Sequence, residues 1–105
     1  MINNKLKNIF DGKKVFVYKV QKGESVSILA KRYHTTKEIL ISINGLSCEI
    51  SDGEYIVVER VEGEEYTVEP LDSIESIAER FSTTSWEIMT KNKIDFVYVG
   101  QKIYI

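Results

Sequence analysis

The feature that most constrains the fold of this 105-residue chain is an internal repeat. Residues of the first half return 48 positions later: Tyr18 with Tyr66, Ser25 with Ser73, Ala30 with Ala78, Arg32 with Arg80, Thr35 with Thr83, and Asn44 with Asn92. After this last pair the second copy is one residue shorter. A repeat of this length is one supersecondary unit used twice. We therefore predict two small modules at residues 15–58 and 66–105, a short charged linker at 59–65, and a leader at 1–14.

Each copy has the pattern strand, helix, helix, strand. Alternating apolar residues predict a strand at 15–20, and residues 55–58 and 102–105 predict closing strands that pair antiparallel with the first strand of their copy. An apolar stripe at i, i+3, i+4 and i+7 predicts the first helix of each copy. Its members are Val26, Leu29, Ala30 and Tyr33, repeated as Ile74, Ile77, Ala78 and Phe81.

Side-chain oxygens mark the predicted helix starts. Ser25 and Ser73 precede the first helices, where a hydroxyl can accept from the open amides of the first turn. Thr36 and Thr84 take this place before the second helices, and Glu87 would complete a capping box with Thr84. The second helices are predicted to end near Asn44 and Asn92, because asparagine tolerates the left-handed conformation of a helix terminus.

The leader has an apolar pattern of its own. Ile2, Leu6, Ile9 and Phe10 would share one helical face, and Asp11-Gly12 would stop that helix. Two interpretations remain open: a frayed leader that packs loosely, or a segment that docks on the repeats or on another protein.

Composition and charge exclude several functional classes. Hydrophobic residues are 43% and charged residues 29%, as in globular proteins. No run approaches the ~18 apolar residues of a membrane span, and the N-terminus has no apolar core of a secretory signal. The net charge is −2, divided as +3 over residues 1–58 and −5 over residues 59–105, which does not favour nucleic-acid binding. We expect synthesis in the cytoplasm without a recognisable signal peptide.

Catalytic and metal-binding signals are missing from the sequence. The single Cys48 cannot form an internal disulfide, and the single His34 cannot supply a histidine pair for a metal. No metalloprotease, serine-nucleophile or phosphate-binding motif occurs. We expect a protein that is not an enzyme and needs no cofactor.

Both copies resemble the LysM module. The first reads YKVQKGESVSILAKRY, then TTKEILISINGL and GEYIVV; the second reads YTVEPLDSIESIAERF, then TTSWEIMTKNKI and GQKIYI. The resemblance implies an α+β fold of two βααβ modules, each with two helices packed on one side of a two-stranded antiparallel sheet. It also implies binding of N-acetylglucosamine-containing glycans such as peptidoglycan or chitin.

By matched position, the resemblance places the glycan groove between the loop that enters the first helix and the loop that leaves the second. In the first copy these residues are Gly23, Glu24, Ser25, Val26, Asn44, Gly45, Leu46 and Ser47. In the second they are Asp72, Ser73, Ile74, Asn92, Lys93, Ile94, Asp95 and Phe96, of which Phe96 is a candidate for sugar stacking. Pro70-Leu71 replaces Lys22-Gly23 at the rim, which removes a backbone donor and the freedom of glycine. We therefore expect the first copy to bind better.

Two functional hypotheses follow. The first is a non-catalytic carbohydrate-binding protein of the bacterial cell wall or spore envelope, with peptidoglycan preferred over chitin-type oligomers. The second is a structural or assembly protein of a spore envelope or phage-type tail, which uses the modules for protein contacts. Trp86, predicted on the outward side of the second helix, would then contact a second copy or an envelope protein.

Overall fold

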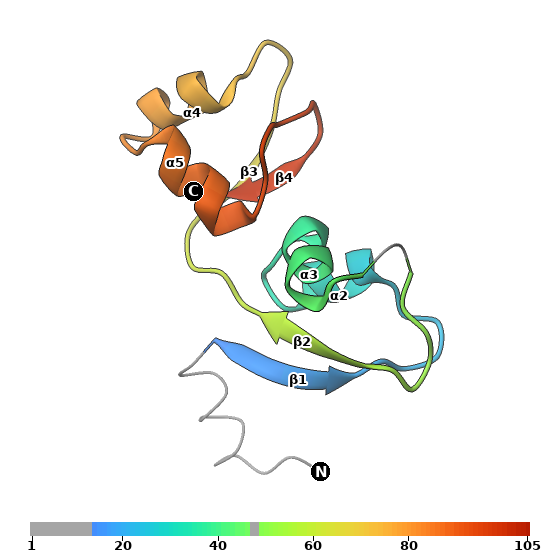
Figure 1. Cartoon of the computed structure of the whole chain (residues 1–105). Coiled ribbons are helices and arrows are strands. Elements are labelled where there is room, and N and C mark those ends of the chain that lie inside the picture. The colour runs from blue at the N-terminus through green and yellow to red at the C-terminus, as the bar shows by residue number, and fades with distance from the viewer. Residues whose placement is uncertain (1–13, 47–48) are drawn as a thin grey trace. The chain divides into compact units, whose positions relative to one another are not determined.

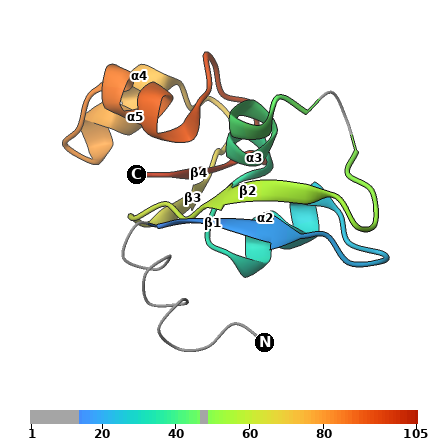
Figure 2. The ribbon, with the colours of Figure 1, turned by 60° about the horizontal axis from the view of Figure 1, so that its bottom comes forward.

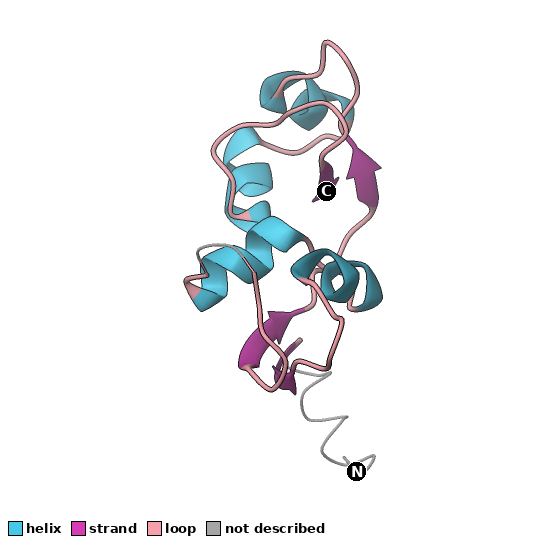
Figure 3. Ribbon diagram, turned by 90° about the vertical axis from the view of Figure 1, so that its right-hand side faces the viewer, coloured by secondary structure: helices cyan, strands magenta, loops and turns pink. Residues whose placement is uncertain are grey.

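The computed structural model describes residues 14–46 and 49–105 and divides the chain into two compact units between Arg60 and Val61. Within the described residues, each unit contains two helices and one two-stranded sheet, and Figure 3 shows how these helices and strands are arranged. The predicted leader helix, Ser47 and Cys48 lie outside the described residues.

The first unit has the predicted element order. Strand β1 (Val15–Lys19), helices α2 (Val26–Arg32) and α3 (Lys37–Asn44), and strand β2 (Tyr55–Glu59) follow one another. Strands β1 and β2 lie side by side and antiparallel, with Val17 opposite Val57 (Figure 2). The helices lie on one face of this sheet (Figure 1).

The second unit repeats this order. Strand β3 (Glu65–Thr67), helices α4 (Ile74–Arg80) and α5 (Ser85–Asn92), and strand β4 (Lys102–Tyr104) follow one another, and β3 pairs antiparallel with β4. The α+β fold of two βααβ modules is therefore confirmed. The segment predicted as a linker, 59–65, is shorter in the structure, because Glu59 is the last residue of β2 and Glu65 is the first residue of β3.

Each unit has its own apolar core, and the predicted helix stripes supply much of it. In the first unit the buried cluster is Val20, Val26, Leu29, Ala30, Leu40, Ile56 and Val58, and in the second it is Val68, Ile74, Ile77, Ala78, Ile88 and Ile103. The last stripe residue, Tyr33 or Phe81, is partly buried against it. Because neither unit contains a disulfide in the described residues, burial of these side chains is the main source of stability.

The predicted N-caps are confirmed. The hydroxyl of Ser25 accepts from Ile28 N at 3.2 Å, and that of Thr36 accepts from Ile39 N at 3.1 Å. In the second unit Ser73 accepts from Ser76 N at 3.0 Å, and Ser76 Oγ accepts from Ser73 N at 2.9 Å. This capping box was not predicted, because serine at the third helical position is a weaker signal than Glu or Gln.

The capping box predicted at Thr84 is not formed. Thr84 Oγ1 does accept from Glu87 N at 3.1 Å, so Thr84 is an N-cap. The Glu87 carboxylate, however, accepts from the hydroxyls of Thr84 and Thr83 at 3.1 and 3.2 Å and does not reach back to the N-cap amide. Two neighbouring hydroxyl donors draw the carboxylate away from that amide.

The second helices end where predicted, but the left-handed conformation predicted for the two asparagines is wrong. Asn44 and Asn92 are the last helical residues, and the left-handed positions fall one residue later, at Gly45 (φ 62°) and Lys93 (φ 57°). The asparagine side chains are therefore free to point into the unit, where they bind the closing strand.

Candidate functional site

The loop that enters the first helix forms the same tight turn in both units. Glu24 N donates to Gln21 O, and Asp72 N donates to Glu69 O, each at 3.1 Å. The third turn residue has a positive φ in both cases, +85° at Gly23 and +74° at Leu71. Type II turns require such a φ and favour proline at the preceding position, which Pro70 occupies.

The exchange of Gly23 for Leu71 therefore alters the chemistry of the rim and not the conformation of the turn. A left-handed leucine costs on the order of 1 kcal/mol relative to glycine, and the second unit tolerates this cost. The Leu71 side chain is fully exposed, whereas a Cβ added at Gly23 would meet nothing within 4 Å. The rim of the first unit has no side chain at this position, whereas the rim of the second unit carries the exposed leucine side chain.

In each unit, both loops of the predicted groove contribute an apolar side chain to the same core. Leu46, in the loop that leaves α3, packs against the core cluster that contains Val26 from the start of α2. In the second unit Ile94 packs against the cluster that contains Ile74. Phe96 lies in the same loop and is 70% exposed, so its ring is accessible.

The Glu24 carboxylate is held within the first unit. It accepts from Gln21 N at 2.7 Å, from Tyr18 OH at 2.8 Å and from Arg32 Nη1 at 2.7 Å. The Gln21 amide, followed by the Arg32 and Tyr18 donors, holds the pKa of Glu24 below its usual value. The carboxylate therefore stays ionised and fixes the turn to both β1 and α2.

Asp72 makes the same arrangement in the second unit. Its carboxylate accepts from Tyr66 OH at 2.5 Å, from Glu69 N at 2.8 Å and from Arg80 Nη2 at 2.8 Å. The hydrogen bond from Tyr66 is the largest of the causes that lower the pKa of Asp72 to about 2, and it also raises the pKa of Tyr66. We call each set, Tyr18 with Glu24 and Arg32 or Tyr66 with Asp72 and Arg80, the turn triad of its unit.

The sequence analysis assigned Glu24 and Asp72 to the glycan groove and missed the tyrosines and arginines that hydrogen-bond to their carboxylates. The signal was present in the repeat, because a tyrosine, an acid six residues later and an arginine eight residues after that occur in both copies. The side-chain oxygens of Glu24 and Asp72 are thus committed to the protein itself. What the turn offers a ligand is its backbone and the residues at its tip.

The side chains of Asn44 and Asn92 likewise form their hydrogen bonds within the protein. Asn92 is 1% exposed; its Nδ2 donates to Ile88 O and Tyr104 O at 2.9 and 2.8 Å, and its Oδ1 accepts from Tyr104 N at 2.8 Å. Asn44 makes the matching contacts with Leu40 O and with both backbone groups of Val57. We call each arrangement the asparagine clamp of its unit.

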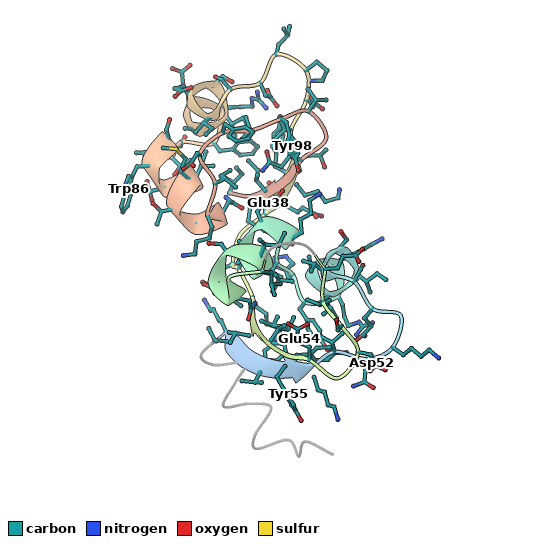
Figure 4. All side chains as sticks on the ribbon, turned by 45° about the vertical axis from the view of Figure 1, so that its right-hand side comes forward. Glu38, Asp52, Glu54, Tyr55, Trp86 and Tyr98 are labelled. Atoms are coloured by element: carbon teal, nitrogen blue, oxygen red, sulfur yellow. The ribbon has the colours of Figure 1, made fainter. Side chains whose placement is uncertain are left out.

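The rims of the two sites differ in polarity. A second turn, Ser51–Glu54 in the first unit and Tyr98–Gln101 in the second, is tied to the first by backbone bonds of Val20 or Val68. The exposed tip residues of this turn are Ser51 and Asp52 in one unit and Tyr98 and Val99 in the other (Figure 4). Together with the exchange of Lys22-Gly23 for Pro70-Leu71, these replacements make the first rim polar and the second rim apolar.

Trp86 lies on the outward side of its helix, as predicted. It projects from α5 with 69% of its side chain exposed, and its counterpart on α3 is Glu38 (Figure 4). Within residues 14–46 and 49–105, no three His, Cys, Asp or Glu side chains are grouped so that they could hold a metal ion. No helix of that same part of the chain is long and apolar enough to cross a membrane.

Comparison with known proteins agrees with the repeat. The family model described as LysM domain matches residues 18–50 and 66–105. The chain is 31% identical over 109 aligned positions to the N-acetylmuramoyl-L-alanine amidase sle1 of Staphylococcus aureus strains USA300 and COL, covering 84% of this chain and 33% of the amidase. The chain thus spans about a third of the length of these relatives.

Among solved structures, the chain is similar to two spore cortex-lytic enzymes named SleL. The Bacillus cereus enzyme has 26% identity and a TM-score of 0.42 over 87% of this chain and 22% of the enzyme. The Bacillus megaterium enzyme has 23% identity and a TM-score of 0.45 over 88% of this chain and 22% of the enzyme.

Proposed function

Because the chain belongs to the LysM domain family, we propose that it binds glycans that contain N-acetylglucosamine, with peptidoglycan as the principal ligand and chitin-type oligomers as the second. The observation that carries this proposal is the family match, which spans both copies with their paired loops. The amidase sle1 supports peptidoglycan, because its name places its activity at N-acetylmuramoyl-L-alanine. We further propose that these modules attach to the cell wall or spore envelope and do not catalyse a reaction themselves.

Binding through the backbone suits this ligand. An N-acetylglucosamine unit presents an amide and hydroxyl groups that need partners, and a methyl group that needs a small apolar surface. The carboxylates and amides of the turn triads and asparagine clamps already have partners within the protein. We therefore propose that main-chain groups of residues 23–26 and 44–47 bind the polar groups, with Val26 and Leu46 beside the methyl.

The two modules are proposed to differ in affinity. In the second, residues 71–74 and 92–96 take the corresponding role, but Pro70 lacks an N–H and the exposed Leu71 side chain stands at the rim. We propose that the first module binds the glycan more tightly. Linkage of two weak sites raises the effective concentration of the second site once the first is occupied.

Co-sedimentation with insoluble peptidoglycan and, separately, with chitin tests the proposal. We expect pelleting that N-acetylglucosamine oligomers reverse. Gly23→Leu should weaken it, and this variant should fold because Leu71 adopts the same φ in the second unit. The matched variant is Leu71→Gly, which should leave binding unchanged or strengthen it. A folded protein that pellets with neither polymer would refute glycan binding.

The exposed Trp86 favours one second candidate, an assembly role in which the modules contact proteins. Sedimentation equilibrium over a range of concentrations tests it. A mass that rises with concentration in the parent chain and not in Trp86→Ala would support assembly through this side chain. A constant monomer mass for both would refute self-assembly through Trp86.

A further inference from the structure

The outward face of the β1–β2 sheet carries an apolar surface that the helices do not cover. Val17 pairs with Val57 across the two strands, with Val15 and Tyr55 diagonal to this pair. The charged residues of this face are at its two ends, where Glu59 pairs with Val15 and Lys19 pairs with Tyr55. Val15, Val17 and Tyr55 are 40%, 54% and 66% exposed. Figure 4 shows Tyr55 pointing away from the helices. We call the four apolar residues the outer sheet face.

The fold does not require this surface to be apolar. At the positions of Val15, Val17 and Tyr55 the second unit has Gly63, Glu65 and Lys102. At the position of Val57 it has Tyr104, which is only 3% exposed. The same βααβ module therefore forms without apolar side chains at three of these four positions. Contact of apolar valine side chains with water is unfavourable. A segment that covers the apolar face of the first unit would therefore stabilise it.

The sequence next to the outer sheet face supplies an occupant of matching character. The segment 2–10 has the apolar stripe Ile2, Leu6, Ile9 and Phe10, and only residues 11–14 separate it from Val15. Asp11-Gly12 is a turn signal that permits the chain to reverse. Nine helical residues would span about 13 Å, and a five-residue strand spans about 16 Å.

Covalent attachment favours this segment over a separate partner. Docking of a tethered segment loses far less translational freedom than association of a second molecule. The second unit again provides the comparison, because β3 is preceded by the charged residues Glu62 and Glu64 and has no apolar stripe before it. The apolar face and the apolar segment thus occur together in one copy and are both missing from the other.

We propose that residues 2–10 of the same chain lie with their apolar stripe on the outer sheet face. The first unit would then consist of the sheet with α2 and α3 on one side and the N-terminal segment on the other. This surface is distinct from the loops proposed to bind glycan, so glycan binding and docking can each fail without the other.

Methyl NMR of the full chain with a soluble nitroxide tests the proposal. Val99 is 64% exposed and Val17 is 54% exposed, so an uncovered Val17 would lose methyl signal to a similar extent. We expect Val15 and Val17 to be much less attenuated than Val99. In the variant Leu6→Gln/Ile9→Gln, the methyl signals of Val15, Val17 and Val99 should be attenuated to a similar extent. In the control variant Lys5→Gln/Lys7→Gln, whose changes lie off the apolar stripe, Val15 and Val17 should remain much less attenuated than Val99.

Nuclear Overhauser contacts identify the occupant. We expect contacts from the Phe10 ring to the Val17 methyls within one chain, and none between labelled and unlabelled chains in a mixed sample. Equal attenuation of Val17 and Val99 in the parent chain would overturn the proposal. Contacts seen between chains in the mixed sample would overturn it in favour of a second copy.

Discussion

Two adjacent threonines provide a prediction in which the same substitution has opposite effects. Thr35 and Thr36 are 4% and 5% exposed, at the start of α3. Thr36 Oγ1 accepts from Ile39 N, whereas the buried Thr35 Oγ1 has no hydrogen-bond partner among the described residues. In the second unit the matching hydroxyl of Thr83 donates to Glu87, but the first unit has Ile39 in place of that acid.

The magnitudes follow from what each hydroxyl does. Valine has nearly the shape of threonine, so Thr35→Val removes an unpaired buried hydroxyl without opening a cavity. The desolvation cost of such a group is ~1–3 kcal/mol, so we expect the free energy of unfolding to rise by about 1 kcal/mol. Thr36→Val removes an N-cap and should lower the free energy of unfolding by about 1 kcal/mol.

Urea unfolding followed by the amide signals of Leu29 and Ile39, both in the first unit, measures the difference. We expect the midpoint of Thr35→Val above that of the parent chain and the midpoint of Thr36→Val below it. Thr83→Val serves as a further control and should destabilise the second unit slightly, because its hydroxyl is paired. If Thr35→Val destabilises as much as Thr36→Val, the Thr35 hydroxyl has a partner and the reasoning fails.

The remaining predictions concern the second unit. Asn92→Ala removes the two hydrogen bonds that the Asn92 side chain makes with the backbone of buried Tyr104. The loss of a partner by a buried polar group costs ~1–3 kcal/mol, so we expect the Trp86 fluorescence transition to move to a much lower urea concentration. An unchanged transition would contradict the role of the asparagine clamp. The lowered pKa of Asp72 means that its ionised form stabilises the folded state above its unfolded pKa, and that this stabilisation is lost as the pH falls toward about 2. We therefore measure the free energy of unfolding of the parent chain and of Asp72→Asn at about pH 5 and at about pH 2.5. This free energy should fall less in Asp72→Asn than in the parent chain, and an equal fall in both proteins would refute the role of Asp72.

The sequence was sufficient to predict the elements because the repeat tested each pattern twice. The apolar stripe of the first helix is an example, because Leu29 and its counterpart Ile77 are both fully buried. The hydroxyl N-caps were likewise recognisable from residue type and position. Local patterns of this kind depend on neighbours within one helical turn, which a linear sequence displays directly.

The candidate site was less predictable because its side chains are committed over longer separations. Asn44 is four residues from Leu40 but thirteen from Val57, and the second contact decides its role. Glu24 likewise bonds Arg32 eight residues away, so a residue assigned to the groove by position serves the turn triad. Positional matching assigns a residue to a loop but does not show which of its polar atoms already have hydrogen-bond partners within the protein.

The asparagine clamps also limit aggregation of the chain through its sheet edges. A two-stranded sheet has an open edge on each strand, and an open edge is a template for addition of a further strand from another chain. In β2 the amide and carbonyl of Val57 are bonded to the Asn44 side chain, and in β4 those of Tyr104 are bonded to Asn92. Val57 lies in the middle of β2 and Tyr104 is the last residue of β4. One asparagine side chain in each unit thus occupies backbone groups of an outer strand edge that an added strand would need, which protects a small sheet from strand-by-strand aggregation.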